Sequence, residues 1–177
     1  MESFPNMLMI GGNARKSGKT TFICRLLEAC GAGHTIGAAK IALYDDEGDF
    51  GRHHPDALPE RYLAIHEQKP GKKDSGKYLA AGAQESWFLA ALPEKEGEVM
   101  ERIRAISRRN DLMVLESNTL RKNIEPAFFV MINNPERTTK KSAQELNHLV
   151  DYVIYTGSKG FNEPGHYIGI ENGRWTI

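Results

Sequence analysis

The chain has little cysteine, no excess charge of either sign and no long apolar run. Of its 177 residues only Cys24 and Cys30 are cysteines, and no second pair completes the four ligands of a structural zinc site. Lysine plus arginine equal aspartate plus glutamate at 23 each, so nothing indicates general attraction to nucleic acid or to a membrane. The start, MESFPNMLMIGG, lacks the charged n-region of a signal peptide, and its apolar run is too short for a membrane span. The sequence therefore predicts a cytoplasmic protein with two reduced thiols.

Hydrophobic residues make up 40% of the chain, which suits one domain, 1–177, with a single core.

The first 43 residues show the pattern of a βαβ unit. Residues 7–10 are fully apolar, as in a strand buried on both faces. Apolar residues then recur at helical spacing from residue 19, glycines at 31–33 end that helix, and 34–43 reads as a second strand. Two strands joined in this way are expected to be parallel.

The rest of the chain continues the α/β pattern after one interruption. Residues 44–77 are polar, rich in Pro and Gly, and too long for a plain connection, so we expect a functional or mobile insertion. The patterns predict helices over 74–81, 94–110 and 139–150, and strands over 85–92, 111–117, 127–134 and 151–157. The tail 166–177 alternates and turns at Asn172-Gly173, a strong hairpin signal. The predicted fold class is α/β, with a mostly parallel sheet and a small C-terminal β-hairpin.

The segment NARKSGKTT, residues 13–21, lies between the first predicted strand and the first predicted helix. Glycines at such a turn let backbone N–H groups close on phosphate oxygens, aided by the positive end of the helix. In such a loop Lys19 reaches the β- and γ-phosphates and the Thr20 hydroxyl binds Mg²⁺. This placement predicts the three-layer fold of P-loop NTPases. The predicted phosphate-binding residues are Asn13, Ala14, Arg15, Lys16, Ser17, Gly18, Lys19, Thr20 and Thr21.

Asn13 stands where the loop pattern has its first glycine. That position often has a positive φ, and asparagine is one of the few other residues that tolerate it. We therefore expect Asn13 to replace the glycine in a left-handed conformation. Arg15 and Lys16 either contact a phosphate or a second anion, or are solvated charges at the tip of the loop.

Four stretches of the sequence, taken in order, resemble the molybdopterin-guanine dinucleotide biosynthesis protein B family. They are SGKTT (17–21), GAAK (37–40), PGKKDSGKYLAAGAQ (70–84) and DLMVLES (111–117). Their order and spacing agree with the family over residues 7–117. The chain departs from the family after Lys40, where Ile41 replaces the start of a histidine cluster, and at Ser117, where the family has glycine. Residues after 120 show no match to the family.

The resemblance implies a nucleotide-binding protein that uses GTP and requires Mg²⁺. It places Asp74 at the active site, near metal or phosphate, although Asp74 is also a good helix N-cap. A phosphorylated pterin or another anionic small molecule is a candidate second ligand for the lysines at 72, 73 and 77, and a protein of cofactor biosynthesis is a candidate partner. A homodimer stays open.

Two further residues are expected to face the predicted loop. Glu116 closes a buried strand, where P-loop proteins place the acid that orients water on Mg²⁺. Lys40 ends the second strand and points to the crevice where ligands bind in open sheets. The predicted catalytic residues are thus Lys19, Glu116 and Asp74, and the predicted metal ligands are Thr20, Glu116 and Asp74. The lysines at 72, 73 and 77 form either a second anion site or a solvated charge run.

The choice between GTP and ATP is open at the sequence level. Asn133 or Asn134, at the end of a predicted strand, is expected to contact the purine, beside the backbone of Ser158 and Lys159. The Asn-Lys-x-Asp signature for guanine is missing, because Asn134, Pro135 and Glu136 replace its last three residues.

Three functions fit these patterns. The first is an NTP hydrolase with low intrinsic turnover, or an accessory factor, in molybdenum cofactor biosynthesis. The second is a small-molecule kinase or an ATP-dependent synthetase of the dethiobiotin synthetase type, with an acceptor held by the insertion. The third is a nucleotide-gated adaptor without significant turnover.

Overall fold

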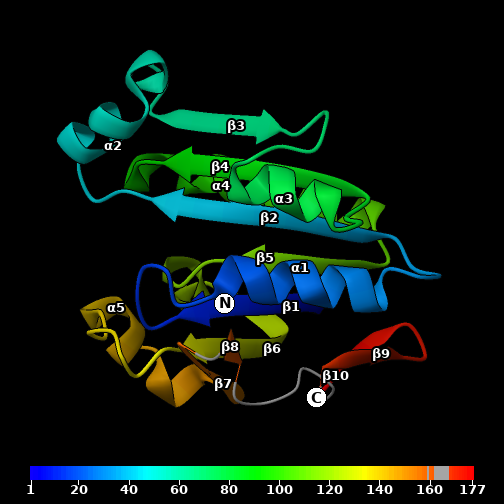
Figure 1. Cartoon of the computed structure of the whole chain (residues 1–177). Helices are drawn as coiled ribbons and strands as arrows, with labels where there is room; N and C mark the ends of the chain where they lie inside the picture. Colours follow the sequence, from blue (N-terminus) through cyan, green and yellow to red (C-terminus); the bar gives the residue numbers. More distant parts are fainter. Residues whose placement is uncertain (159, 162–167) are drawn as a thin grey trace.

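The computed structural model describes residues 1–158, 160–161 and 168–177, and its centre is one eight-stranded sheet. The described strands are β1 (Glu2–Gly12), β2 (Ile36–Leu43), β3 (Tyr62–His66), β4 (Glu85–Ala91), β5 (Leu112–Glu116), β6 (Ile124–Asn133), β7 (Tyr152–Gly157), β8 (Gly160–Phe161), β9 (Gly169–Glu171) and β10 (Arg174–Thr176). The sheet order is β3-β4-β2-β5-β1-β6-β7-β8 (Figure 1). The inner pairings are parallel, and β3 and β8 add antiparallel edges. A mostly parallel α/β sheet is therefore confirmed.

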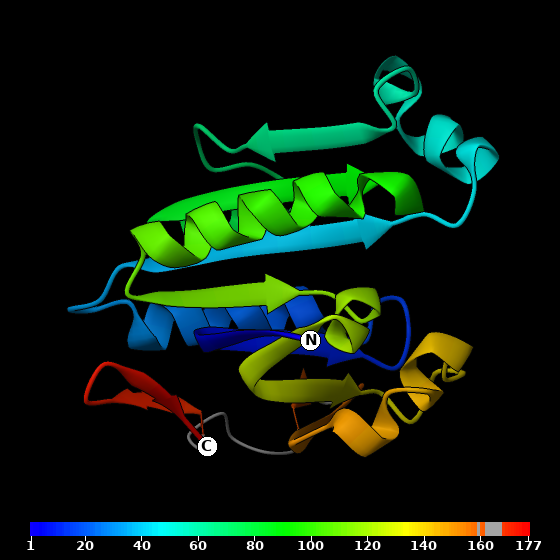
Figure 2. The same ribbon diagram turned by 180° about the vertical axis from the view of Figure 1, so that it is seen from behind.

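Helices cover both faces of this sheet. The described α-helices are α1 (Lys19–Cys30), α2 (Glu47–His53), α3 (Asp74–Ala80), α4 (Glu96–Arg109) and α5 (Lys141–Gln144). Short 3-10 turns occupy Pro55–Ala57, Pro93–Lys95, Thr119–Lys122 and Asn147–Leu149. α1 and α3 lie on one face (Figure 1), and α4 crosses the other (Figure 2). The sheet is thus the middle of three layers.

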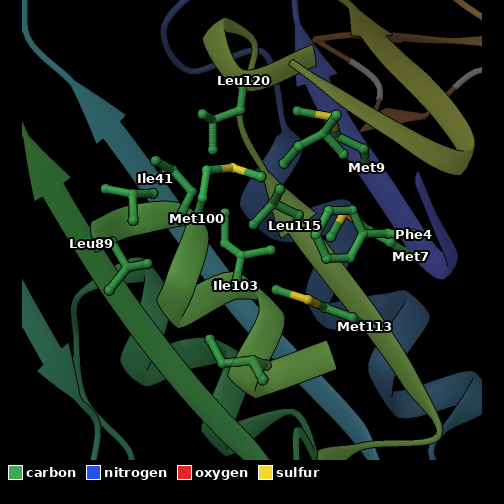
Figure 3. Packing of buried hydrophobic residues seen from close by; sticks show 14 of the residues in the cluster. Phe4, Met7, Met9, Ile41, Leu89, Met100, Ile103, Met113, Leu115 and Leu120 are labelled. Atoms are coloured by element: carbon green, nitrogen blue, oxygen red, sulfur yellow. The ribbon is translucent and has the colours of Figure 1, made fainter. Parts of the chain in front are cut away.

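Alternation along β1 explains why its core segment reads as a continuous apolar run. Leu8 and Ile10 belong to the core under α1, whereas Met7 and Met9 belong to the core under α4. All four side chains are fully buried. Figure 3 shows the second core, with Met7 and Met9 close to side chains of α4 and β5. A strand covered on both faces needs apolar residues at every position, which removes the period of two.

The predicted βαβ unit and the C-terminal hairpin are both present. β1, α1 and β2 follow in order, but β5 lies between the two strands in the sheet. The hairpin of β9 and β10 turns at Asn172 and Gly173, whose φ values of 52° and 71° fit a two-residue turn. Trp175 anchors the hairpin, since its indole N–H donates to the carbonyl of Asn6 at 3.0 Å. The first two residues of the predicted tail, 166 and 167, lie outside the described residues.

Residues 44–77 differ from the polar insertion that the sequence predicts. They contain α2, a 3-10 turn, the edge strand β3 and the start of α3. β3 pairs antiparallel with β4, and Phe50 of α2 is fully buried against Ala90 and Leu92. The stretch therefore has secondary structure and a buried aromatic residue of its own, which its polar composition does not indicate. The run YLAIH at 62–66 is short and half-buried, so its pattern is weak until β4 lies beside it.

The predicted helix over 139–150 is also wrong in length. Only α5 and the 3-10 turn Asn147–Leu149 form there. Ala143 and Leu146 are its buried anchors, three residues apart, and they hold the segment against the core under α4. A three-residue spacing suits tight turns as well as it suits an α-helix.

Candidate functional site

The loop between β1 and α1 folds over the side chain of Lys19. Its backbone enters the left-handed region at Lys16, with φ 57°, and at Gly18, with φ 99°. The Lys19 ammonium donates to the carbonyl of Ala14 at 3.3 Å and to the Ser17 hydroxyl at 3.5 Å. A Cβ at Gly12 would lie 2.5 Å from Ser17 Oγ and 2.8 Å from Lys19 Nζ, so glycine makes this close approach possible. The helix begins at Lys19 without a side-chain cap, which leaves its first N–H groups facing the loop.

Asn13 has a role other than the predicted one. Its φ is not positive, and the left-handed residue of the loop is Lys16 instead. The buried Asn13 side chain donates to the Asn134 carbonyl at 2.9 Å and accepts from the Asn134 N–H at 3.0 Å. The side-chain amide of Asn13 also donates to Thr139 Oγ1 at 3.3 Å, and the backbone carbonyl of Asn13 accepts from the Lys140 N–H at 2.8 Å. The side-chain amide of Asn13 has the same donor and acceptor as a backbone amide. Its two bonds to the backbone of Asn134 therefore extend the hydrogen bonding between β1 and β6 by one residue.

Two cations and two carboxylates meet in front of this loop. Glu116, the last residue of β5, is 4% exposed. Its Oε1 lies 3.4 Å from the Lys40 ammonium and 3.9 Å from the Lys19 ammonium. Lys40 also pairs with Asp74, the first residue of α3. Glu116 ends β5, Lys19 and Asp74 begin α1 and α3, and Lys40 of β2 lies in register beside Glu116.

Tyr78 is a member of this cluster that the sequence did not indicate. Its hydroxyl donates to Glu116 Oε2, and its side chain is fully buried. Thr20 lines the same cleft as Asp74 and Glu116. Tyr78 lies four residues after Asp74, one turn along the same face of α3. That spacing is the signal that could have identified it.

Burial and nearby charges shift the pKa values of Lys19, Lys40 and Asp74 in opposite directions, and they act together on Tyr78. Burial lowers the pKa of Lys19, although Glu116 opposes the change. Burial alone would also lower the pKa of Lys40, but the charges of Glu116 and Asp74 outweigh it and raise that pKa. For Asp74, burial is likewise outweighed, because the bond from Lys40 holds its pKa below the usual value. Burial and the charge of Glu116 raise the pKa of Tyr78 well above its usual value, so its hydroxyl remains a donor.

The cluster opens into a cleft of about 550 Å³. The cleft is lined by Arg15, Lys16, Ser17, Gly18, Lys19, Thr20, Thr21, Lys40, Asp74, Lys77 and Glu116. Most predicted site residues therefore meet in one place. Lys77 joins them, with its ammonium 3.5 Å from Asp74 Oδ1, whereas Lys72 and Lys73 do not line the cleft.

Four predicted binding residues lie outside the cleft lining. Asn13 bonds to Asn134, and the Ala14 carbonyl accepts from the Lys19 ammonium. Asn133 lines a separate pocket on the α4 side of the sheet. The Ser158 N–H donates to Glu136 Oε1 at 3.3 Å, and the predicted neighbour Lys159 lies outside the described residues.

Asn118 is a second residue that the sequence did not indicate. Its Oδ1 accepts from the Gly12 N–H at 2.9 Å, and its Nδ2 donates to the Gly12 carbonyl at 3.0 Å. A Cβ at Gly11 would come within 2.8 Å of Asn118 Oδ1. The chain that follows Glu116 therefore braces the glycine pair that begins the loop.

The donor set of the cleft suits a hard cation and an anion together. Among the described residues, no three His, Cys, Asp or Glu side chains come close enough to enclose a metal ion. Glu116, Asp74 and the Thr20 hydroxyl offer oxygen donors, beside the ammonium groups of Lys19 and Lys40. Mg²⁺ is commonly held by one or two carboxylates while it keeps waters and phosphate oxygens as its other ligands. The residues present fit that arrangement.

Comparison with models of known protein families, with curated proteins and with solved structures finds no match. No described helix is long and apolar enough to cross a membrane. The resemblance to the molybdopterin-guanine dinucleotide biosynthesis protein B family thus rests on the four sequence stretches alone.

Proposed function

We propose that this chain is a P-loop protein that binds a nucleoside triphosphate, GTP or ATP, together with Mg²⁺. The observation that carries the proposal is the meeting of Lys19 and Thr20, at the start of α1, with Glu116, at the end of β5, in one cleft. Lys19 is held by the loop that precedes it, and Glu116 is held by Tyr78 and Lys40. A site with fixed cations and carboxylates at the positive end of a helix favours a phosphate chain with its metal.

Each residue has a role in this proposal that follows from its chemistry. The N–H groups at the start of α1 and the Lys19 ammonium bind phosphate oxygens, because both are donors that face the cleft. Thr20, Glu116 and Asp74 would hold the metal, which supplies charge neutralisation of the phosphates when it is bound. Arg15 and Lys16 line the outer wall, where a further anion would meet them.

Two enzymatic outcomes and one non-enzymatic outcome remain within the proposal. Lys77 and Lys40 flank Asp74 and leave room in the 550 Å³ cleft for a second anionic ligand. This favours either transfer of a phosphoryl group to a small acid or a phosphorylated pterin, or slow hydrolysis within the maturation of a molybdenum cofactor. An adaptor would bind the nucleotide without either reaction. The pathway assignment depends only on the four motif stretches.

Lys19→Ala tests the proposal. Loss of a charge-assisted contact to phosphate is expected to weaken the binding of Mg·GTP, Mg·ATP and inorganic tripolyphosphate by about a hundredfold. Titration calorimetry measures the three ligands, and the thermal unfolding midpoint shows whether the fold is intact. Lys122→Ala is the matched control, because Lys122 is exposed and pairs with Glu145 away from the cleft.

The wild-type result decides the class of protein. If neither triphosphate nor tripolyphosphate binds in the presence of Mg²⁺, the cleft is not a nucleotide site. If they bind, phosphate release with and without neopterin phosphate separates hydrolysis, transfer and simple binding.

A further inference from the structure

A side chain of β7 holds the loop between β1 and α1 from outside the cleft. Thr156 is 5% exposed and is not among the residues that line the cleft. Its hydroxyl donates to the carbonyl of Ser17 at 2.8 Å, across 139 residues of sequence. A Cβ at Gly18 would lie 3.3 Å from the Thr156 methyl group and 3.6 Å from the Phe161 ring of β8. The last residues of the loop therefore pack against β7 and β8.

The strand β8 is also held against α1 by contacts that do not involve Thr156. The ring of Phe161 meets the ring of Phe22 edge-to-face, with centroids 5.8 Å apart. The Arg25 guanidinium lies over the same Phe161 ring, 5.0 Å from its centroid. These contacts keep β8 beside the start of α1 whether or not Thr156 bonds to the loop. Removal of the Thr156 hydroxyl therefore changes one bond and leaves the surrounding packing in place.

The bond from Thr156 fixes the direction of the peptide group between Ser17 and Gly18. A trans peptide group is planar, and its C=O and N–H point in opposite directions. In the sheet, β6 and β7 lie on one side of β1, whereas β5 and β2, which carry Glu116 and Lys40, lie on the other. Since the Ser17 carbonyl points to β7, the Gly18 N–H points away from β7, toward the charged groups of the cleft.

The Gly18 N–H is available to a ligand. Ser17 and Gly18 both line the cleft. The Gly18 carbonyl accepts from the Phe22 N–H at 2.9 Å, but within the described residues the Gly18 N–H makes no hydrogen bond. Glycine at this position, with φ 99°, allows the peptide group more rotation than other residues would. If the group turned over, a carbonyl oxygen would face the cleft and repel an anion.

We infer that Thr156 is a positioning residue for phosphate binding: its hydroxyl holds the Ser17 carbonyl outward, so that the Gly18 N–H stays directed at a polyphosphate in the cleft. The inference rests on the proposed function, because it concerns the same loop. Thr156 itself touches no phosphate, and its effect passes through one backbone donor. The strength of that donor depends on its direction, because hydrogen bonds weaken steeply away from linear geometry.

Thr156→Val and Thr156→Ser test the inference through tripolyphosphate binding, measured by titration calorimetry in EDTA so that no metal contributes. Valine keeps the shape of the side chain and removes the hydroxyl, so the affinity should fall about fivefold. Serine keeps the hydroxyl and should bind within about twofold of wild type. In amide NMR spectra, tripolyphosphate should shift the Gly18 signal in wild type and in Thr156→Ser but much less in Thr156→Val. The Lys19 amide signal should shift in all three proteins.

Thr35→Val is the matched control. The Thr35 hydroxyl donates to Asp111 Oδ2 at 2.9 Å, next to the first residue of β5, whereas Glu116 is the last residue of that strand. Loss of this bond should lower the thermal unfolding midpoint, as loss of the Thr156 bond does. It should leave tripolyphosphate affinity unchanged, because Thr35 does not touch the loop.

Three results would overturn the inference. The first is equal binding by wild type and Thr156→Val, or an equal shift of the Gly18 signal, which would leave the proposed function intact. The second is a loss in Thr156→Ser or Thr35→Val as large as that in Thr156→Val, which would make the effect one of general stability. The third is failure of the wild type to bind tripolyphosphate with or without Mg²⁺, which would remove the proposed function and the inference together.

Discussion

The two ends of the central strands carry polar clusters of opposite character. At the amino end of β4, the Glu85 carboxylate accepts four hydrogen bonds, two from Arg109 and one each from Asn110 and Trp87, at 2.7 to 3.1 Å. At the carboxyl end of β5, Glu116 lies among two lysines and a tyrosine, and the same cations face an open cleft. In the Glu85 cluster the carboxylate oxygens are occupied by fixed donors of the protein, whereas Glu116, Lys19 and Lys40 line an open cleft.

This difference separates structural from functional charge. A carboxylate whose oxygens are all occupied by fixed donors stabilises the fold and offers nothing to a ligand. Ammonium groups that are partly buried beside a cleft keep an attraction that the protein itself does not fully satisfy, and a phosphate or a metal completes it. Variants in the two clusters should therefore change different measured quantities.

The largest expected effect is that of Glu116→Gln on metal-dependent binding. The substitution keeps the size of the side chain but removes the charge that a cation requires. Mg²⁺ should increase the affinity for tripolyphosphate in the wild type, and the variant should lose about tenfold to a hundredfold of that increase. Titrations with Mg²⁺ and with EDTA measure this difference. A variant that keeps the full Mg²⁺ effect would show that Glu116 is a structural strand end.

A smaller effect, on stability and not on binding, is expected for Glu85→Gln. The variant loses charge-assisted bonds from Arg109 and Trp87, which should lower the free energy of unfolding by about 2 kcal/mol at neutral pH. Urea denaturation measures the loss, and tripolyphosphate affinity should stay as in wild type. A fall in affinity equal to that of Glu116→Gln would remove the distinction between the two clusters.

The same variant should also change the acid dependence of stability. Burial would raise the pKa of Glu85, but the bonds from Arg109, Trp87 and Asn110 outweigh it and hold that pKa below its ordinary value of 4.5. The stabilisation is therefore present above pH 4.5 and is lost as the pH falls through the folded-state pKa. The difference in stability between wild type and Glu85→Gln should shrink in that acidic range. A difference that stays constant from pH 7 to pH 3 would contradict the role of this carboxylate.

The sequence predicted those helices and strands whose hydrophobic pattern extends over one continuous segment. β1, α1 and β2 were predicted because an apolar run and a helical period each extend over enough residues. β3 was missed because its five half-buried residues become a strand only through pairing with β4. The insertion of β5 between β1 and β2 depends on contacts far apart in the sequence, which no local period encodes.

The site follows the same division. Lys19, Thr20 and Glu116 could be predicted to meet because each lies at the end of an element, and the structure brings them to one cleft; their phosphate and metal chemistry stays a prediction. Asn13 was assigned to the correct loop but to the wrong role, since its partners, Asn134 and Lys140, are more than 120 residues away. Tyr78 and Asn118 look like ordinary polar or aromatic residues until the structure shows what they hold.

The smallest predicted effect concerns Tyr78, which we interpret as a positioning residue for Glu116. Tyr78→Phe removes the hydroxyl that donates to Glu116 Oε2 and keeps the ring that fills the core under α1. The Glu116 carboxylate then retains Lys40 and Lys19 but gains freedom to turn. Loss of one such bond corresponds to about 1 kcal/mol, so the Mg²⁺-dependent part of tripolyphosphate affinity should fall by about fivefold.

The control for this effect is binding measured in EDTA. A purely structural role of Tyr78 would lower stability and weaken tripolyphosphate binding equally with and without Mg²⁺. A positioning role changes only the Mg²⁺-dependent part, because Lys19 and the N–H groups of α1 are untouched. The double variant with Glu116→Gln provides the final check: once Glu116 has lost its charge, removal of the Tyr78 hydroxyl should have no further effect on the Mg²⁺ dependence. Additive losses would show that the hydroxyl acts independently of Glu116.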